Sequence, residues 1–190
     1  HDRRRQAPQH VRVLDNLRSG FRRNLDGLAC EFIEASILDQ GTLRRAMRGV
    51  DYVFHASALK QVPACEQAPY EAYQTNTVGS FNACQAAKAN GVKVFIALST
   101  DKAVKPINSM GMSKGMMEKI VCNQNMSECD TVFACVRYGN VMGSRGSVIP
   151  LFRSLIDENK PLTLTAPKMT RFMMTLDESV DLVLHAMLTA

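Results

Sequence analysis

The sequence predicts an α/β fold in which helices cover both faces of a parallel sheet. Two observations support this prediction. Short apolar runs alternate with helical patterns along the whole chain, which is typical of parallel α/β proteins. The chain has 190 residues, of which 46% are hydrophobic, enough for one sizeable core. No run approaches the roughly 18 apolar residues that a membrane span needs.

The expected elements follow in order from hydrophobic periodicity and turn signals. Strands are expected at residues 11–15, 31–35, 51–55, 92–98, 131–137 and 162–164. Helices are expected at residues 43–47, 66–90, 109–124, 148–159 and 178–188. In the second of these helices apolar residues recur at steps of three to four, and the pair Asn90-Gly91 suits a left-handed cap at its end.

Three reactive side chains follow the strand expected at 92–98. They are Thr100, Asp101 and Lys102, a hydroxyl, a carboxylate and an ammonium in consecutive positions. In an open α/β sheet, ligands sit outside the carboxyl ends of the strands, so these groups are placed where chemistry can occur. The alternative is a polar loop before the next helix. On that helix Lys114 comes one turn after Met110.

The first expected strand indicates a dinucleotide site. Asp15 ends it, and an acid in that place binds the adenosine ribose hydroxyls in dinucleotide-binding folds. The alternative is an Asp that caps the following helix. None of the eleven glycines forms the G-x-G-x-x-G turn that opens such folds, and about ten residues precede Val11. We therefore expect a doubly wound sheet that lacks its first strand-helix unit.

Four motifs resemble the extended short-chain dehydrogenases/reductases that act on nucleotide sugars, in particular UDP-N-acetylglucosamine 4,6-dehydratases, including the C5-inverting type. The motifs are HASALKQVP at 55–63, STDKAVKPIN at 99–108, RYGNVMGSRGSVIP at 137–150 and MTRFMMT at 169–175. The resemblance implies a Rossmann-like, NAD(P)-binding domain over residues 1–147, incomplete at its N-terminus. It also implies the start of a truncated sugar-nucleotide-binding lobe over 148–190.

The same resemblance implies a reaction. A 4,6-dehydratase oxidises C4, removes the C5 proton, expels the C6 hydroxyl as water and returns hydride to C6. Asp101 would be the C6 acid, Lys102 the C5 base and Thr100 the partner of the C4 oxygen, while Lys114 would bind the nicotinamide ribose. Related enzymes usually have Tyr where this chain has Met110, and a thioether has no proton to exchange. We expect Met110 to face the core.

The resemblance implies further binding residues. The expected cofactor-binding residues are Asp15, Asp39, Ala56, Ser57, Ala58, Asn76, Lys114, Tyr138, Asn140 and Val141. The expected substrate-binding residues are Lys60, Asn140, Arg145, Ser147 and Arg171. The two arginines suit diphosphate oxygens, with a solvated surface role as the alternative. The cofactor is NAD or NADP: NADP is typical of the resembled dehydratases, whereas Asp15 favours NAD by repelling a 2′-phosphate, and Arg18 could reverse that preference.

Composition narrows the class of partner. The net charge of +5 suits an anionic ligand such as a UDP-sugar, and the basic residues are too scattered to indicate nucleic acid. The six cysteines have no C-x-x-C spacing, and the histidines have no metal-type spacing. We expect a reduced cytoplasmic protein without a bound metal or a membrane span, which forms a homo-oligomer.

The favoured function is that of a nucleotide-sugar 4,6-dehydratase, which converts UDP-N-acetylglucosamine to a 4-keto-6-deoxy sugar for surface polysaccharide or glycan biosynthesis. A UDP-sugar 4-epimerase is the first alternative, suggested by the run Asp15-Asn16-Leu17. The pair Asp101 and Lys102 argues against it, since epimerisation needs no C6 acid. The second alternative is a non-catalytic, truncated chain that acts through protein association.

Overall fold

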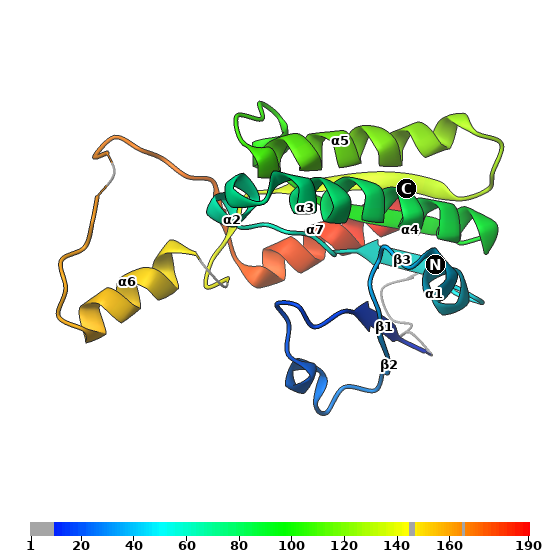
Figure 1. The fold of residues 1–190 in the computed structure, drawn as a ribbon, viewed down its shortest axis with the longest axis horizontal. Coiled ribbons are helices and arrows are strands. Elements are labelled where there is room, and N and C mark those ends of the chain that lie inside the picture. The colour runs from blue at the N-terminus through cyan, green and yellow to red at the C-terminus, as the bar shows by residue number, and fades with distance from the viewer. Residues whose placement is uncertain (1–9, 145–146, 165) are drawn as a thin grey trace.

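The strands form parallel sheets, as the alternation of strands and helices predicts. The computed structural model describes residues 10–144, 147–164 and 166–190 (Figure 1). Strand β1 (Arg12–Asp15) pairs with β2 (Glu31–Glu34), and β3 (Tyr52–His55), β4 (Val94–Thr100) and β5 (Val132–Tyr138) form a second sheet in that order. Every pairing is parallel.

The strand order is that of a doubly wound fold. In the first sheet β2 lies beside β1. In the second sheet β4 lies between β3 and β5. Within the described residues β1 and β3 do not pair, and each keeps one free edge. The residues that follow β1 and β3 nevertheless line one cleft, so the carboxyl ends of both sheets open to the same side.

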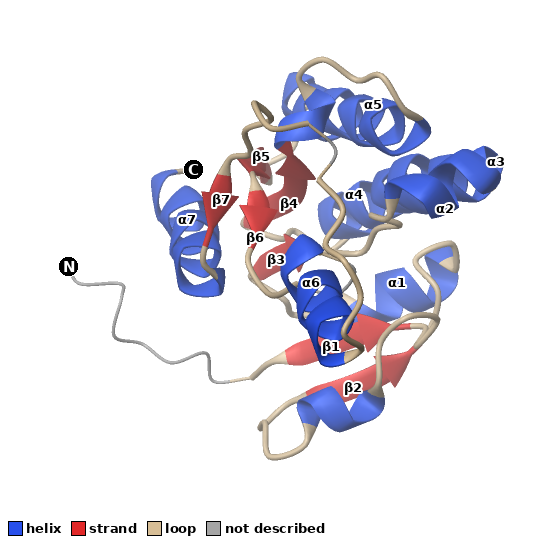
Figure 2. Cartoon of the chain, turned by 90° about the vertical axis from the view of Figure 1, so that its left-hand side faces the viewer, coloured by secondary structure: helices blue, strands red, loops and turns tan. Residues whose placement is uncertain are grey.

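Helices occupy both sides of the larger sheet, as Figures 1 and 2 show. The helical elements are η2 (Arg22–Leu25), α1 (Gln40–Ala46), α2 (Val62–Gln67), α3 (Pro69–Tyr73), η3 (Gln74–Val78), α4 (Gly79–Ala89), η4 (Asp101–Ala103), α5 (Ser109–Asn123), η5 (Gln124–Met126), α6 (Val148–Asp157) and α7 (Leu176–Thr189). Helices α3 and α4 form one run through the wider turn η3, over the region where the sequence predicts one long helix.

Alternation along β4 divides the core into two layers. Phe95 and Ala97 point to one face, where they pack with residues of α4 and α5 such as Met117. Val94 and Ile96 point to the other face, where α7 covers them. Burial on both faces explains why this strand is an uninterrupted apolar run in the sequence.

One expected strand is absent. Residues 162–164 form no strand and pair with no described strand, and Leu164 is exposed. A short strand forms further on instead, where β7 (Met173–Met174) pairs in parallel with β6 (Asn140–Val141). A Cβ on Gly139 would lie 2.3 Å from the Phe172 ring, so this approach of two chain segments requires glycine.

Side-chain caps fix the two helices nearest the carboxyl ends of the strands. The Asn108 side chain accepts a hydrogen bond from Gly111 N at 2.8 Å and begins α5. Thr175 and Glu178 form a reciprocal capping box at α7, so this helix begins at Leu176, two residues before the expected start at 178. In the described part of the chain, no helix is long and apolar enough to cross a bilayer.

Candidate functional site

A cleft of about 900 Å³ opens at the carboxyl ends of β3, β4 and β5. Loops that follow these strands form its floor, and α7 supplies an apolar wall. The lining residues include Ala56, Ala58, Lys60, Thr100, Lys102, Met110, Lys114, Tyr138, Asn140, Val141, Ser147, Val180 and Leu184. The structure therefore brings together most of the residues that the motifs single out, from segments up to about 90 positions apart.

The triplet at the end of β4 is joined by hydrogen bonds. Thr100 Oγ1 donates to Asp101 Oδ1 at 2.9 Å, and Lys102 Nζ donates to the same oxygen at 3.0 Å. Lys102 Nζ also lies 3.3 Å from Asn140 Oδ1, which ties the loop to β6. Partial burial raises the pKa of Asp101, but the bonds from Lys102 and Thr100 outweigh it and leave that pKa below its usual value.

Lys114 is a buried ammonium at the base of the cleft. Its residue is only 5% exposed, and Nζ donates to the carbonyl of Leu98 at 2.8 Å and lies 3.6 Å from Met117 Sδ. Burial lowers the pKa of Lys114 to about 8, against the opposing influence of Cys135 and Glu118. Such an amine exchanges its proton close to neutral pH, so it can act in acid–base chemistry or as a fixed donor.

Asn76 holds the loop between β3 and α2 against α5. Its Nδ2 donates to the Leu59 carbonyl at 2.9 Å and to Ser113 Oγ at 3.0 Å, and its Oδ1 accepts from Leu59 N at 2.7 Å. Asn76 is fully buried and lines neither cleft, so its structural role is to hold the loop that lines them. Nearby, His55 Nε2 lies 2.7 Å from Ser80 Oγ. Burial lowers the pKa of His55 to about 3, so its ring is neutral.

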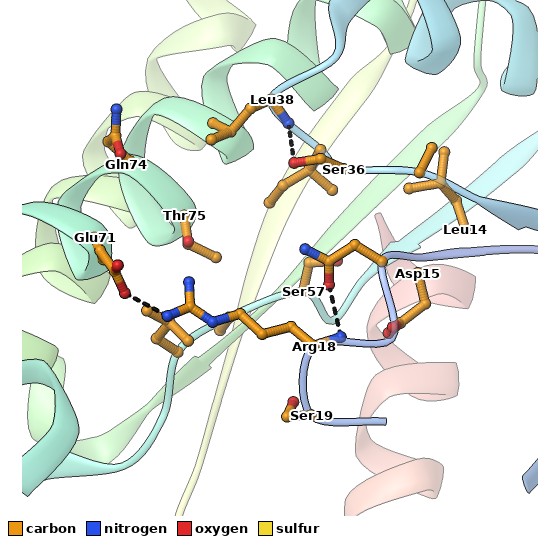
Figure 3. Close-up of a pocket in the computed structure, with 15 residues that line it drawn as sticks. Leu14, Asp15, Arg18, Ser19, Ser36, Leu38, Ser57, Glu71, Gln74 and Thr75 are labelled. Atoms are coloured by element: carbon orange, nitrogen blue, oxygen red, sulfur yellow. Dashed lines mark hydrogen bonds and ion pairs between the residues drawn. The ribbon is translucent and has the colours of Figure 1, made fainter. Parts of the chain in front are cut away.

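A second cleft, of about 300 Å³, lies between the end of β1 and the loop after β3 (Figure 3). Asp15 lies at its mouth, where Oδ1 accepts a hydrogen bond from Leu17 N at 2.6 Å. Arg18 reaches across to an ion pair with Glu71 on α3. Ala58 lines both clefts, so the two spaces meet at that residue.

Asp39 and Arg171 line neither cleft, and Asp101 is not a lining residue either, although its neighbours Thr100 and Lys102 line the larger cleft. Asp39 caps α1 through Thr42 N at 3.0 Å and is not a lining residue. Arg171 is exposed and donates only to the neighbouring carbonyl of Thr170, at 3.0 Å, among the bonds described. Arg145 lies outside the described residues. The cofactor role of Asp39 and the substrate roles of both arginines stay predictions.

Met110 faces the core, as its helical position predicts. It is 4% exposed and packs in a small cluster with Cys65 and Ala72. Its thioether touches the cleft but cannot exchange a proton. The base that related enzymes have in this place must therefore be another residue, and Lys102 and Lys114 are the candidates in the cleft.

Sequence reasoning missed one structural pair beside the site. Glu118, one turn after Lys114 on α5, binds Arg137 on β5 through two hydrogen bonds of 2.9 and 2.6 Å. The four-residue spacing of Lys114 and Glu118 on the helix was the available signal, but the sequence does not show which strand carries the partner of Glu118. Among the described residues, no cluster of side chains suits a metal ion.

A family model decides the relationship of this chain. The model described as "Polysaccharide biosynthesis protein" matches residues 12–190. The chain belongs to this polysaccharide biosynthesis protein family.

Curated relatives of this family member come from Rickettsia. A protein named UDP-glucose 4-epimerase from Rickettsia bellii (strain RML369-C) is 56% identical over 158 residues, which cover 82% of this chain and 46% of the relative. A protein of the same name from Rickettsia prowazekii (strain Madrid E) is 52% identical over 164 residues, 85% of this chain and 48% of the relative. The chain thus spans about half the length of the curated relatives it matches.

Solved structures confirm the Rossmann-like fold of this family member. The X-ray structure of Pen from Bacillus thuringiensis matches with a TM-score of 0.87 and 38% identity, over 95% of this chain and 57% of that one. A UDP-glucose 4-epimerase from Thermotoga maritima, solved with UDP-glucose, matches with a TM-score of 0.85 and 27% identity, over 94% and 65%. A dTDP-glucose 4,6-dehydratase from Streptomyces venezuelae, at 23% identity and a TM-score of 0.82 over 90% and 60%, shares the fold.

Proposed function

We propose that this polysaccharide biosynthesis protein is a nucleotide-sugar 4,6-dehydratase that converts UDP-N-acetylglucosamine to a 4-keto-6-deoxy sugar. One observation carries the proposal. A carboxylate and an ammonium, Asp101 and Lys102, form a hydrogen-bonded pair 3.0 Å apart after β4, in which Lys102 lines the cleft and Asp101 is exposed beside it. A 4,6-elimination needs one group to take the C5 proton and another to protonate the leaving C6 oxygen, and this pair can provide both.

The pair can supply a base and an acid at the same time. In the free structure the hydrogen bonds from Lys102 and Thr100 favour an ionised Asp101. Transfer of one proton from Lys102 Nζ to Asp101 Oδ1 turns the amine into a base and the carboxylate into an acid. A bound sugar that excludes water from the pair favours this neutral form, because desolvation disfavours charge. Thr100 donates a hydrogen bond to Asp101 and lines the cleft, so in this proposal it is also the partner of the C4 oxygen.

The two clefts suit an extended ligand such as a nicotinamide dinucleotide. They meet at Ala58, with Asp15 at one end and the buried Lys114 at the other. When bound, such a cofactor supplies the hydride acceptor for C4 and the hydride donor for C6. Asp15 would bind the adenosine ribose and Lys114 the nicotinamide ribose, while Ser57 lines the smaller cleft together with Asp15.

The larger cleft offers polar groups for the nucleotide sugar. Lys60, Asn140 and Ser147 line it, and the buried Ser147 Oγ has no hydrogen-bond partner in the described part of the chain. A buried hydroxyl that lacks a hydrogen-bond partner is stabilised when a ligand supplies one. Ser147 is therefore a substrate contact in this proposal, together with Lys60 and Asn140.

A UDP-sugar 4-epimerase is the second candidate, and the names of the curated relatives favour it. Both reactions oxidise C4, so both need a base for the C4 hydroxyl, and Met110 cannot supply it in either case. Lys102 and Lys114 are the candidates for that base. Only elimination also needs an acid at C6, and the Asp101–Lys102 pair offers one. The side chains at the cleft therefore favour elimination.

Product analysis in deuterated water separates the two candidates. The assay uses a completed enzyme, in which residues 10–190 of this chain replace the matching part of the Rickettsia bellii relative, and the chain alone in parallel. We expect UDP-N-acetylglucosamine to lose its C6 hydroxyl and to gain deuterium at C5, both visible by NMR. A C4 epimer that keeps its C6 hydroxyl would establish the second candidate instead. Turnover of neither UDP-N-acetylglucosamine nor UDP-glucose by the completed enzyme would refute both.

A further inference from the structure

One face of α5 lies against one side of β5 in a fixed register. On the helix, Glu118 and Cys122 are four residues apart and share a face. On the strand, Cys135 and Arg137 are two residues apart and point to the same side of the sheet. The two hydrogen bonds between Glu118 and Arg137, 2.9 and 2.6 Å long, hold the helix at one position along the strand.

One turn along the helix from this ion pair, two free thiols meet. Cys122 Sγ lies 3.9 Å from Cys135 Sγ. A disulfide bond brings two sulfurs to about 2 Å, so these atoms need only a small further approach. The ion pair holds α5 at this position on β5, so the two thiols stay next to each other.

The two thiols differ in their access to solvent. Cys122 is exposed, so a dissolved reagent can reach its sulfur. Cys135 is partly buried, and burial together with the neighbouring Cys122 thiol raises the pKa of Cys135 far above its usual value. The two thiols should therefore react in a fixed order. Cys122 reacts first with the reagent, and Cys135 lies beside the product of that reaction.

We propose that Cys122 and Cys135 are a redox modification site, which a small-molecule disulfide such as glutathione disulfide converts to an intramolecular disulfide bond. The Cys122 thiolate attacks one sulfur of the reagent, so that a mixed disulfide forms and one glutathione thiolate leaves. Cys135 then gives its proton to solvent and attacks the Cys122 sulfur, which releases the second glutathione. The two protein thiols lose two electrons and two protons in total, and the reagent is reduced to two thiols.

The site differs from the clefts in both position and chemistry. Neither Cys122 nor Cys135 lines either cleft. The bond would nevertheless join the helix that carries Lys114 to the strand that ends at Tyr138, so it would pin two cleft-forming elements together. Cys65 and Cys84 are fully buried in the core and offer a reagent no comparable access.

The test incubates the 190-residue chain in glutathione buffers of increasing oxidising strength and maps its thiols by non-reducing peptide mass spectrometry. We expect a Cys122–Cys135 disulfide in most molecules of the wild type, at a rate that does not depend on protein concentration. In Cys135→Ser the resolving thiol is gone, so glutathione should remain on Cys122. In Cys122→Ser, modification of Cys135 should fall at least tenfold. The matched control Cys30→Ser should form the disulfide like the wild type.

Three results would overturn the proposal. Glutathione that persists on Cys122 in the wild type would show that Cys135 cannot reach it. A disulfide between two copies of the chain would show that the thiols pair differently. Modification of Cys84 alongside Cys122 would show that the core between α5 and β5 is not maintained, and the proposed pairing depends on that packing.

Discussion

The ammonium of Lys114 donates a hydrogen bond to the main-chain carbonyl of Leu98 over 2.8 Å, from α5 to the end of β4. Leu98 comes two residues before Thr100, where the strand ends. The bond therefore places a buried positive charge directly behind the Thr100–Lys102 triplet. That burial has a consequence for stability, because the folded protein must keep the ammonium out of water.

Lys114→Met should change how stability depends on pH. The pKa of Lys114 is about 8 in the folded chain against 10.5 for the free side chain, so the unfolded state binds more protons between these values. Stability from this group therefore rises as the pH increases from about 8 to 10.5, by roughly 3 kcal/mol. Denaturant titrations over that range should show the rise in the wild type and its loss in the variant.

Lys119→Met is the matched control, because Lys119 lies on the same helix but is exposed. Its pH profile should follow the wild type. Parallel profiles of wild type and Lys114→Met across the alkaline range would contradict the burial of the charge.

Substitution of the acid–base pair should abolish elimination while it leaves ligand binding intact. In the completed enzyme, Asp101→Asn keeps the shape and removes the acid, and Lys102→Ala removes the base. Each should lower turnover by about 10²–10⁴-fold, the usual contribution of a general acid or base. Lys102→Ala should also stop deuterium exchange at C5, and NMR of the recovered substrate measures this directly.

The exposed Lys105, in the loop after η4, provides the control for this pair. Lys105→Ala removes the same charge a few residues away and should keep both turnover and exchange. Full turnover and C5 exchange by Lys102→Ala would refute the assignment of the base.

Much of the scaffold could be predicted from the sequence, because it depends on local patterns. The apolar run that became β4 and the polar triplet after it required only hydrophobic periodicity and the rule that ligands sit at strand ends. The strand expected at 162–164 was wrong because a short apolar alternation needs a partner, and no described strand pairs with it. The pairing of β7 with β6 depends instead on the approach of Phe172 to Gly139, which no local pattern reveals.

Contacts between distant segments account for what sequence reasoning missed at the site. The apolar wall from α7 joins the cleft only because that helix folds back over β4 and β5. The bond from Lys102 to Asn140 and the pairing of Glu118 with Arg137 each join residues 19 or more positions apart. Side-chain type indicated that these residues could bind something, but tertiary packing selected the partner.

Removal of one member of the Glu118–Arg137 pair should cost more than removal of both. Glu118 is 8% exposed, so Arg137→Met leaves a mostly buried carboxylate without its cation. We expect a loss of about 1–3 kcal/mol in the free energy of unfolding, towards the lower figure because the arginine is half exposed. Glu118→Gln added to Arg137→Met should recover part of that loss in a double-mutant cycle measured by urea denaturation.

The Glu118–Arg137 pair should also make the stability of the protein fall at acidic pH. Burial raises the pKa of Glu118, but the Arg137 guanidinium outweighs it and holds that pKa below the ordinary 4.5. Its contribution is therefore complete above pH 4.5 and is lost as the pH falls through the lowered value. The variant Arg153→Met, on the distant helix α6, should match the wild type at every pH. An Arg137→Met variant as stable as the wild type at pH 7 would disprove a stabilising pair.

Cofactor preference should depend on the ion pair between Arg18 and Glu71. Asp15 at the mouth of the smaller cleft repels a 2′-phosphate, and Glu71 holds the guanidinium that could otherwise bind one. We therefore expect the completed enzyme to bind NAD more tightly than NADP. Glu71→Gln releases Arg18, and calorimetry should show the ratio of the NADP to the NAD dissociation constant fall by about tenfold, or about 1.4 kcal/mol. Glu34→Gln, at the exposed end of β2, should leave the ratio unchanged. If the wild type already binds NADP more tightly, Asp15 does not set the preference, and if Glu71→Gln leaves the ratio unchanged, Arg18 does not reach the phosphate.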